Sequence, residues 1–430
     1  MQKSFYTARQ PMRSFYDFAT FRSLKHRNFR LLVEGNVIST SGDFMQSIAQ
    51  SWLVWQLTRS PFLLGLVSFF DTVPRLFLGA IGGAIADRFD RRRVLIITQS
   101  LAMVQAAVCF KVILFWHIAV LAFLLGCIDT VNQTVRQSLV NSMVPKEELL
   151  NAIGPQSSFF NLSKILGPSM GGTVIALVGI SGCFFLNALS FMALIWNLYL
   201  MELPPWEAPA KKQGVWKEIK EGYGYLRSNR RILSIVSLCY VVALVGAPYS
   251  RFIPMFATNI LHVGPTGFGL LMSAPGAGAI VSALSLASTR RFRPGILWIC
   301  CCVTGFGLFL GLFTFSHSFG FSLVLLALVG SCQVAGRAAS NTATQVETPP
   351  HLLGRVLSLF FMDIGLWSLG GLAIGSAAAV IGIDHTLTVS AVICIIAAMG
   401  LLSASSGKSP TAPDMARSNL DTETSSRLDF

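Results

Sequence analysis

Charged and amide side chains interrupt long apolar stretches of this sequence at spacings typical of helices. Asp43, Gln46 and Gln50 lie at i, i+3 and i+7, so a helix would place all three on one face. Asp71 and Arg75 lie four residues apart, which allows an ion pair along one helix face. Ionisable groups are costly in an apolar setting, so we treat each of them as a candidate functional residue.

A third polar stripe consists of Asp129, Gln133 and Arg136, which lie at i, i+4 and i+7 and would also share one helix face. Single polar residues of this kind occur in later apolar stretches: Asn161, Lys164, Arg251, Arg337 and Asp363. Together these residues predict a polar cavity. The candidates for its lining are Gln46, Gln50, Gln133, Arg136, Asn161, Lys164, Arg251 and Arg337.

A carboxylate in such a cavity can take up and release a proton as solvent access alternates. Asp43 and Asp129 are the first candidates because neither has a cation four residues away in its own stretch. Asp129 would instead be structural if it pairs with the arginine two turns later. Asp71 and Asp363 are further candidates, although Asp71 is expected to pair with the arginine four residues on.

The elements that must carry these residues are membrane-spanning helices. Of the 430 residues, 53% are hydrophobic and 12% are charged, and the mean hydropathy is +0.61. A soluble domain carries about 25% charged residues, and a helix needs about 20 apolar residues to cross a bilayer. Twelve such stretches predict an all-α membrane protein with twelve transmembrane helices: Leu31–Leu57, Phe62–Ala86, Val94–Trp116, Ile118–Val140, Leu150–Val178, Cys183–Leu200, Ile232–Thr258, Gly267–Ala287, Ile296–Phe315, Phe319–Asn341, Val356–Gly382 and His385–Ser405.

The basic residues indicate which loops face the cytoplasm. The net charge of +13 comes mainly from the segment before the first span, the loops after the second and eighth spans, and the stretch between the sixth and seventh spans. The alternate loops carry almost no basic residue besides Arg59. Positive charge retained on one side of a membrane is the topology rule for inserted helices. Both termini and the central loop are therefore predicted to be cytoplasmic, and the charge does not indicate nucleic-acid binding.

An internal repeat divides the chain into two pseudo-symmetric halves. An offset of 204 residues aligns Pro61 with Pro265 and Gly65 with Gly269. Duplication of six-helix units is typical of secondary transporters, whose substrate site lies between the halves. We predict a cytoplasmic arm over 1–30, six-helix bundles over 31–201 and 232–405, a linker with an amphipathic surface helix over 202–231, and a disordered cytoplasmic tail over 406–430.

The sequence contains no constellation typical of an enzyme. The six histidines fall in loops or at the ends of apolar stretches, and the nine cysteines show no metal-ligand spacing. Neither a Gly-x-Ser-x-Gly motif nor a phosphate-binding loop occurs. We predict no enzymatic activity, no metal site and no cofactor, so transport would be driven by an ion gradient or by the solute's own gradient.

The segment between the second and third spans carries a specific motif. Gly83 is followed by three residues, then Asp87 and Arg88, and then a basic cluster that begins at Arg91. This pattern resembles the signature loop of the major facilitator superfamily, although Asp90 stands where the family commonly has glycine. The resemblance implies that Gly83, Asp87, Arg88 and Arg91 form a gating latch between the halves. A basic loop that only sets topology is the alternative.

The fifth span contains Gly167-Pro168, followed two residues later by Gly171-Gly172. Proline kinks a helix, and glycines permit close helix packing. The run resembles the Gly-Pro-x-x-Gly-Gly signature of proton-coupled antiporters in the same superfamily, although Ser163 stands where a further glycine is frequent. The resemblance favours export over uptake, and a plain packing kink is the alternative.

Longer runs are similar to one bacterial branch of the superfamily, which includes enterobactin-type siderophore exporters and related drug exporters. These runs are Asn28–Leu32, Ala49–Val54, Leu57–Pro61 and Phe184–Phe191. The resemblance implies an inner-membrane carrier that exports a siderophore or drug-like molecule in exchange for protons, and we expect the carrier to be monomeric. An uptake carrier for a metabolite or lipid, and a non-transporting sensor or scaffold, are the alternatives.

Overall fold

The computed structural model describes residues 23–110, 114–143, 149–202, 223–288, 295–349 and 352–406. Every regular element in these ranges is helical, which confirms the all-α fold predicted from the sequence. Nine helical spans within them are long and apolar enough to cross a membrane, so the full number of twelve crossings stays a prediction. Residues 1–22 of the predicted N-terminal arm, 203–222 of the predicted linker and 407–430 of the predicted tail lie outside the described residues. The last residues of the predicted arm belong to α1, which begins at Arg27.

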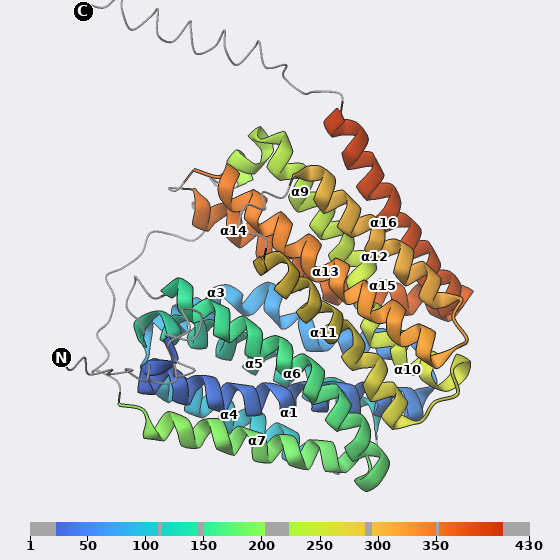
Figure 1. The fold of residues 1–430 in the computed structure, drawn as a ribbon. Helices are drawn as coiled ribbons and strands as arrows, with labels where there is room; N and C mark the ends of the chain where they lie inside the picture. Colours follow the sequence, from blue (N-terminus) through green and yellow to red (C-terminus); the bar gives the residue numbers. More distant parts are fainter. Residues whose placement is uncertain are drawn as a thin grey trace, which may run out of the picture.

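The first half of the chain forms a bundle of long helices, coloured blue to green in Figure 1. Helix α1 packs against α6 and α7, α4 lies against α5 and α7, and α3 lies against α5. Buried Phe29, Leu32, Leu95 and Leu198 fill part of the interior. The bounds of these helices are α1 (Arg27–Thr58), α2 (Pro61–Thr72), α3 (Pro74–Arg88), α4 (Arg91–Cys109), α5 (Phe115–Met143), α6 (Leu149–Val178) and α7 (Ile180–Leu200).

The second half forms a similar group of helices beside the first, coloured yellow-green to red in Figure 1. Helix α12 packs against α13 and α16, and α13 also packs against α11. The elements are α9 (Arg230–Val241), η4 (Val242–Gly246), η5 (Ala247–Phe252), α10 (Ile253–Met255), η6 (Phe256–Ile260), α11 (Pro265–Ser288), α12 (Ile296–Thr314), α13 (Phe319–Glu347), α14 (Leu353–Phe361), α15 (Asp363–Ile381) and α16 (Ile383–Ser406).

Three of the predicted spans contain breaks that their apolar pattern does not reveal. The second span divides at Val73, because Pro74 has no N–H with which to continue the backbone hydrogen bonds. The seventh span passes through π-helical and 3₁₀ turns around Pro248 and Pro254. The eleventh span divides at Met362. These breaks lie beside charged residues, so they help to determine where those side chains point.

The end predicted for the third span is wrong. Helix α4 ends at Cys109, and Phe115 and Trp116 already belong to α5. The N–H of Phe110 bonds to the carbonyl of Ala107, which tightens and ends the last turn of α4. An apolar run alone does not show this turn because its residues are as hydrophobic as the helices on either side.

The two halves meet along two helix pairs, α2 with α15 and α6 with α11. A Cβ on Gly65 would lie 2.5 Å from the carbonyl oxygen of Gly371, and a Cβ on Gly269 would lie 2.5 Å from that of Pro168. A side chain at either position would prevent this approach. Gly65 and Gly269 are the pair aligned by the repeat, so the two copies supply equivalent contacts between the halves.

Side chains near the end of α1 also join the halves. Trp52 stacks on Phe268 of α11 with ring centroids 5.1 Å apart. The indole N–H of Trp55 donates to the hydroxyl oxygen of Thr258 in η6, at 2.8 Å. Together with the glycine contacts, these interactions hold the halves together around the C-terminal end of α1 and the start of α11.

Candidate functional site

A cavity of about 170 Å³ lies between the halves, beside the middle of α1 and α6. Its walls come from α1, α2 and α6 of the first half and from η5, α11, α13 and α15 of the second. Two predicted candidates, Lys164 and Arg251, line it. Its other polar lining residues are Ser47, Ser68, Thr72, Ser250, Gln333 and Trp367.

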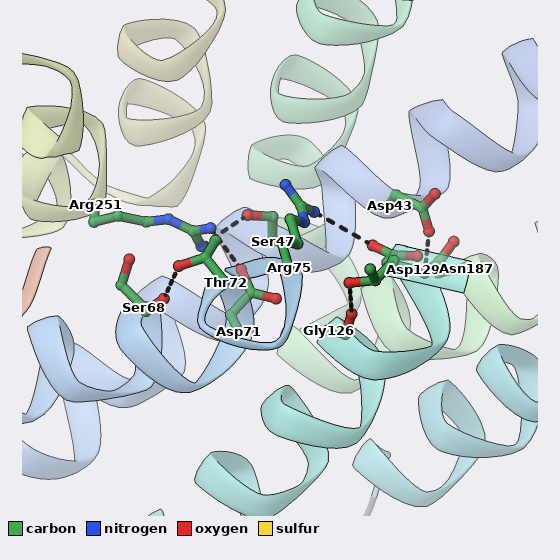
Figure 2. Close-up of polar contacts among 11 residues, drawn as sticks. Asp43, Ser47, Ser68, Asp71, Thr72, Arg75, Gly126, Asp129, Asn187 and Arg251 are labelled. Atoms are coloured by element: carbon green, nitrogen blue, oxygen red, sulfur yellow. Dashed lines mark hydrogen bonds and ion pairs between the residues drawn. The ribbon is translucent and has the colours of Figure 1, made fainter. Parts of the chain in front are cut away.

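Arg251 joins the halves through an ion pair at the edge of this cavity. Its Nη2 atom lies 2.6 Å from Oδ2 of Asp71 in α2, and its Nη1 atom donates to the hydroxyl of Ser47 in α1 at 3.3 Å. Figure 2 shows the guanidinium reaching between these two helices. The expected pairing of Asp71 with Arg75 is therefore wrong. Residue spacing within one helix cannot predict an ion pair with a cation from the other half.

Arg75 instead faces Asp129 of α5, with 3.8 Å between Nη2 and Oδ2. Asp129 has no cation four residues away in its own helix, and the cation that it faces comes from α3. Arg136, the partner predicted as an alternative for Asp129, instead donates to Oδ1 of Asn36 at 3.2 Å. It lines a smaller cavity of about 60 Å³ between α1, α5 and α6, inside the first half.

Asp43 lies at the end of the same row of charges. Figure 2 shows it beside Asp129, on the side away from Arg251. Its Oδ1 atom accepts a hydrogen bond from the side-chain amide of Asn187 at 3.5 Å, and no ion pair joins it to another described residue. The row therefore contains two paired carboxylates, at Asp71 and Asp129, and one that has an amide as its partner.

The amide residues of α1 do not line the large cavity. The side chain of Gln46 bonds to Gln105 of α4 at 3.0 Å and to Asn187 of α7 at 2.8 Å, so it faces the interior of the first half. Gln50 is also buried. The stripe predicted on α1 is thus a real polar face, but most of it connects helices within one bundle.

Arg337 and Asp363 form a second charged pair, inside the second half. The Nη1 and Nη2 atoms of Arg337 both contact the carboxylate of Asp363, and the Nη2 distance is 3.1 Å. The guanidinium carbon also lies 5.6 Å from the ring centroid of Phe360 and 5.9 Å from that of Phe361. This geometry clamps α13 to the break between α14 and α15, and neither residue lines the large cavity.

Two other predicted lining residues also lie elsewhere. Asn161 donates to the carbonyl oxygen of Ser157 in its own helix at 2.9 Å. Gln133 is exposed on α5. Neither residue belongs to the wall of the large cavity.

The signature loop contacts its own half in this conformation. Arg91 donates to the carbonyl oxygen of Ser138 in α5 at 3.3 Å, and Arg88 is exposed. No atom of the described residues would lie within 4 Å of a Cβ on Gly83. The side chain of Asp87 lies outside the described part of the structure. The gating role of this motif stays a prediction.

The Gly-Pro motif packs α6 against both halves. Added Cβ atoms on Gly167 and Gly171 would lie 2.5 Å from Phe44 and 2.8 Å from Ile48, both in α1. An added Cβ on Gly172 would lie 2.5 Å from the carbonyl oxygen of Pro265 at the start of α11. Pro168 lines the cavity. The motif therefore brings the cavity wall next to the contact between the halves.

Sequence reasoning missed several lining residues because they are neutral. Gln333 stands one turn before Arg337 on α13, and Ser47 stands one turn after Asp43 on α1. A search for polar residues at i±4 from each charged residue would have found both. Tyr249 could not have been found in this way, because the irregular turn η5 places it.

The described residues contain no group of three His, Cys, Asp or Glu side chains placed to hold a metal ion. The polar groups of the cavity are one amine, a guanidinium, hydroxyls, an amide and an indole. Such groups suit a small organic ligand held by hydrogen bonds and charge.

Comparison with known proteins identifies a family and relatives. Residues 18–424 match the family described as transmembrane secretion effector. The chain is 26% identical over 361 residues to the enterobactin exporter EntS of Citrobacter koseri, a match that covers 81% of this chain and 85% of that protein. It is 27% identical over 346 residues to the multidrug efflux pump Tap of Mycobacterium tuberculosis, with 76% and 81% covered.

The fold is also that of solved transporters. The crystal structure of the peptide transporter POT in complex with alafosfalin superposes with a TM-score of 0.75, over 92% of this chain and 96% of that one. At 13% sequence identity this likeness concerns the fold alone. It confirms the predicted fold class, that of the major facilitator transporters.

Proposed function

Since this chain belongs to the transmembrane secretion effector family of major facilitator transporters, we propose that it exports a small organic molecule across the bacterial inner membrane. The substrate is a siderophore or a drug-like compound, as the names of the enterobactin exporter and the multidrug efflux pump suggest. Transport proceeds by alternating access of the two halves around the cavity, and protons move in the opposite direction.

The observation that carries this proposal is the cavity itself. Both halves contribute to its walls, and the ion pair between Asp71 and Arg251 crosses from one half to the other at its edge. A rocking movement of the halves would change the access to the cavity and also the geometry of this pair. The site is thus built to respond to the movement that alternating access requires.

Asp43 is the first candidate for the proton carrier. Protonating a carboxylate that faces a cation gives up the attraction between the two charges, which a carboxylate bonded only to an amide does not lose. Asp43 has such an amide partner, whereas Asp129, Asp71 and Asp363 each face an arginine. Asp129 comes second because its separation from Arg75 is 3.8 Å, the widest of the three pairs.

The motifs and the charge distribution support the remaining parts of the proposal. Gly83, Asp87, Arg88 and Arg91 act as the gating latch on the cytoplasmic side, where both termini lie. The Gly-Pro motif of α6 supports antiport, because it resembles the antiporter signature and lies beside the contact between the halves. The carrier works as a monomer, since the cavity is completed within one chain.

Counterflow of protons and substrate in sealed vesicles tests this function. The purified chain is reconstituted with a pH-sensitive dye inside, and catechol siderophores and cationic drugs are added in turn. We expect a substrate-dependent proton signal that Asp43→Asn reduces at least about ten-fold, the loss expected when an essential proton carrier is removed. Asp129→Asn is expected to give a smaller loss.

Glu34→Gln is the matched control, because it removes a carboxylate from the same helix at an exposed position beside Arg30. This variant should transport like the unaltered chain. A proton signal unchanged in Asp43→Asn and Asp129→Asn would move the proton site to Asp71 or Asp363. Substrate movement without any proton signal would refute antiport, and no movement of any compound would refute export.

A further inference from the structure

The cavity between the halves contains a cation that lacks a counter-ion. Lys164 lines its wall from α6, half-buried in the middle of that helix. No hydrogen bond or ion pair joins its ammonium group to any residue that the structure describes. An ammonium group removed from water without a partner is costly, so a lysine retained at such a position indicates a partner that is not always bound.

The acidic residues of the neighbouring helices do not supply this partner. Asp71 faces Arg251, Asp129 faces Arg75, and the carboxylate of Asp43 accepts a bond from Asn187. Among the described residues that line the cavity there is no aspartate or glutamate. The lining therefore carries the positive charges of Lys164 and Arg251, and only that of Arg251 is balanced by a contact with a carboxylate.

A second group of the same cavity also lacks a partner. The indole Nε1 atom of Trp367 in α15 is buried and has no hydrogen-bond acceptor among the described residues. A buried donor without an acceptor is unfavourable, so such groups are rare unless a ligand or water satisfies them. Lys164 and Trp367 thus line one cavity from opposite halves, and the ammonium group of the first and the buried N–H of the second both lack a partner among the described residues.

Besides its hydroxyl and amide groups, the cavity wall has apolar and aromatic side chains. Phe44 and Ile48 of α1, Tyr249 of η5 and Met272 of α11 contribute to it. Flat and apolar surfaces of this kind accept an aromatic or aliphatic ligand body, while a few polar groups fix its orientation. The lining therefore combines apolar and aromatic surface with cationic and donor groups.

We propose that the cavity binds an amphipathic organic anion, with Lys164 as the counter-ion of its carboxylate or phenolate and the Trp367 N–H as a second donor. This assignment rests on the proposed export function for its direction and names the substrate class of the same site. A cationic compound would be repelled by the unbalanced charge of Lys164, so cationic drugs are poor substrates. Because the two donors belong to different halves, an anion held by both of them connects the halves directly.

Three naphthyl probes that differ in charge test the assignment: 2-naphthoate, 2-naphthamide and 2-naphthylmethylammonium. Their binding to the full chain in lipid nanodiscs is measured by equilibrium dialysis, and binding to empty nanodiscs is subtracted. We expect the anion to bind at least about ten-fold more tightly than the neutral amide, as a charge-assisted hydrogen bond gives. The ammonium probe should bind most weakly.

Variants at the two donors locate the anion. Lys164→Gln should weaken naphthoate binding about ten-fold and leave naphthamide binding nearly unchanged, whereas Lys164→Arg should keep the preference for the anion. Trp367→Phe keeps a ring but removes the N–H, and should weaken naphthoate binding about three-fold. Lys25→Gln is the matched control, because it makes the same change at an exposed residue before α1.

Equal binding of naphthoate and naphthamide would overturn the assignment, as would unchanged naphthoate binding by Lys164→Gln. If Lys164→Gln does not elute as a folded protein, the charge series on the unaltered chain and Trp367→Phe decide. The assay uses no gradient, so it is independent of the export proposal. A preference for the anion without flux in vesicles would retain the site and refute export. Proton-coupled efflux of cationic drugs without that preference would refute the anion site and support export.

Discussion

At the scale of single residues, the ion pair between Asp71 and Arg251 is the contact that mutations test most directly. Their side chains are 17% and 24% exposed, so solvent screens the pair only in part. Asp71→Asn and Arg251→Gln each leave one charge without its partner, whereas the double variant removes both charges. We expect the double variant to destabilise less than the sum of the single variants, with a coupling energy of about 1–2 kcal/mol. Thermal unfolding followed by tryptophan fluorescence measures it.

The pair of Arg30 and Glu34 on α1 is the control for this cycle. Its atoms are 3.9 Å apart and its side chains are 42% and 56% exposed. An exposed pair of this kind contributes about 0.3–0.5 kcal/mol at most. Strictly additive effects at Asp71 and Arg251 would show that their contact adds nothing to the stability of the fold.

Residue chemistry alone identified Lys164 and Arg251 as lining candidates, and the cavity contains both. The reasoning worked because a charge within an apolar span must face polar surroundings. It could not assign partners, since Arg251 reaches Asp71 from the other half. It also placed Gln46 in the cavity, because helical spacing groups residues by face and does not say what that face meets.

At the scale of helices, the contact between α6 and α11 depends on the absence of a side chain at Gly172. A Cβ there would lie 2.5 Å from the carbonyl oxygen of Pro265 and 2.8 Å from the Cα atom of Gly269. Gly172→Ala therefore forces the two helices apart and costs about 1–3 kcal/mol in this conformation. A cost of this size changes the ratio of two conformations by about five-fold to a hundred-fold. We expect the distances between spin labels on α6 and α11 to be longer than in the unaltered chain, as measured by double electron–electron resonance.

Gly400→Ala is the matched control for that prediction. Gly400 lies within α16, and no described residue would be within 4 Å of its added Cβ. The control should leave both the label distances and the transport rate unchanged. Distances in Gly172→Ala equal to those of the unaltered chain would show that the contact tolerates a methyl group, and that α6 does not need a glycine there.

The helices themselves were predictable, because each is a long apolar run between polar or glycine-containing breaks. Their internal breaks were less so. Pro74 and Pro248 were visible in the sequence, but a proline within a span can either kink a helix or end it, depending on how neighbouring groups satisfy the free carbonyl. The break at Met362 contains no proline at all. Such a break determines the position of Arg251, so the pattern of apolar residues could not predict it.

At the scale of the whole molecule, the repeat predicted two related halves with a site between them. The aligned glycines Gly65 and Gly269 do make equivalent contacts across the interface. The sequence could not predict at which end the halves touch, because a transporter that alternates between conformations makes different contacts in each. In the arrangement seen here, the halves touch around the C-terminal end of α1 and the starts of α2 and α11.

If transport requires the contact between α2 and α15 to open, a covalent link across this contact will stop it. An added Cβ at Gly371 of α15 would lie 3.3 Å from the Cβ of Ser68 in α2, close to the spacing of a disulfide. We expect the Ser68→Cys, Gly371→Cys double variant to lose nearly all transport after oxidation and to regain it with a reductant. Mass spectrometry of the digested protein confirms the link, and each single variant under the same oxidant controls for the native cysteines. A cross-linked carrier that still transports would show that the halves do not part here, and alternating access through this interface would have to be abandoned.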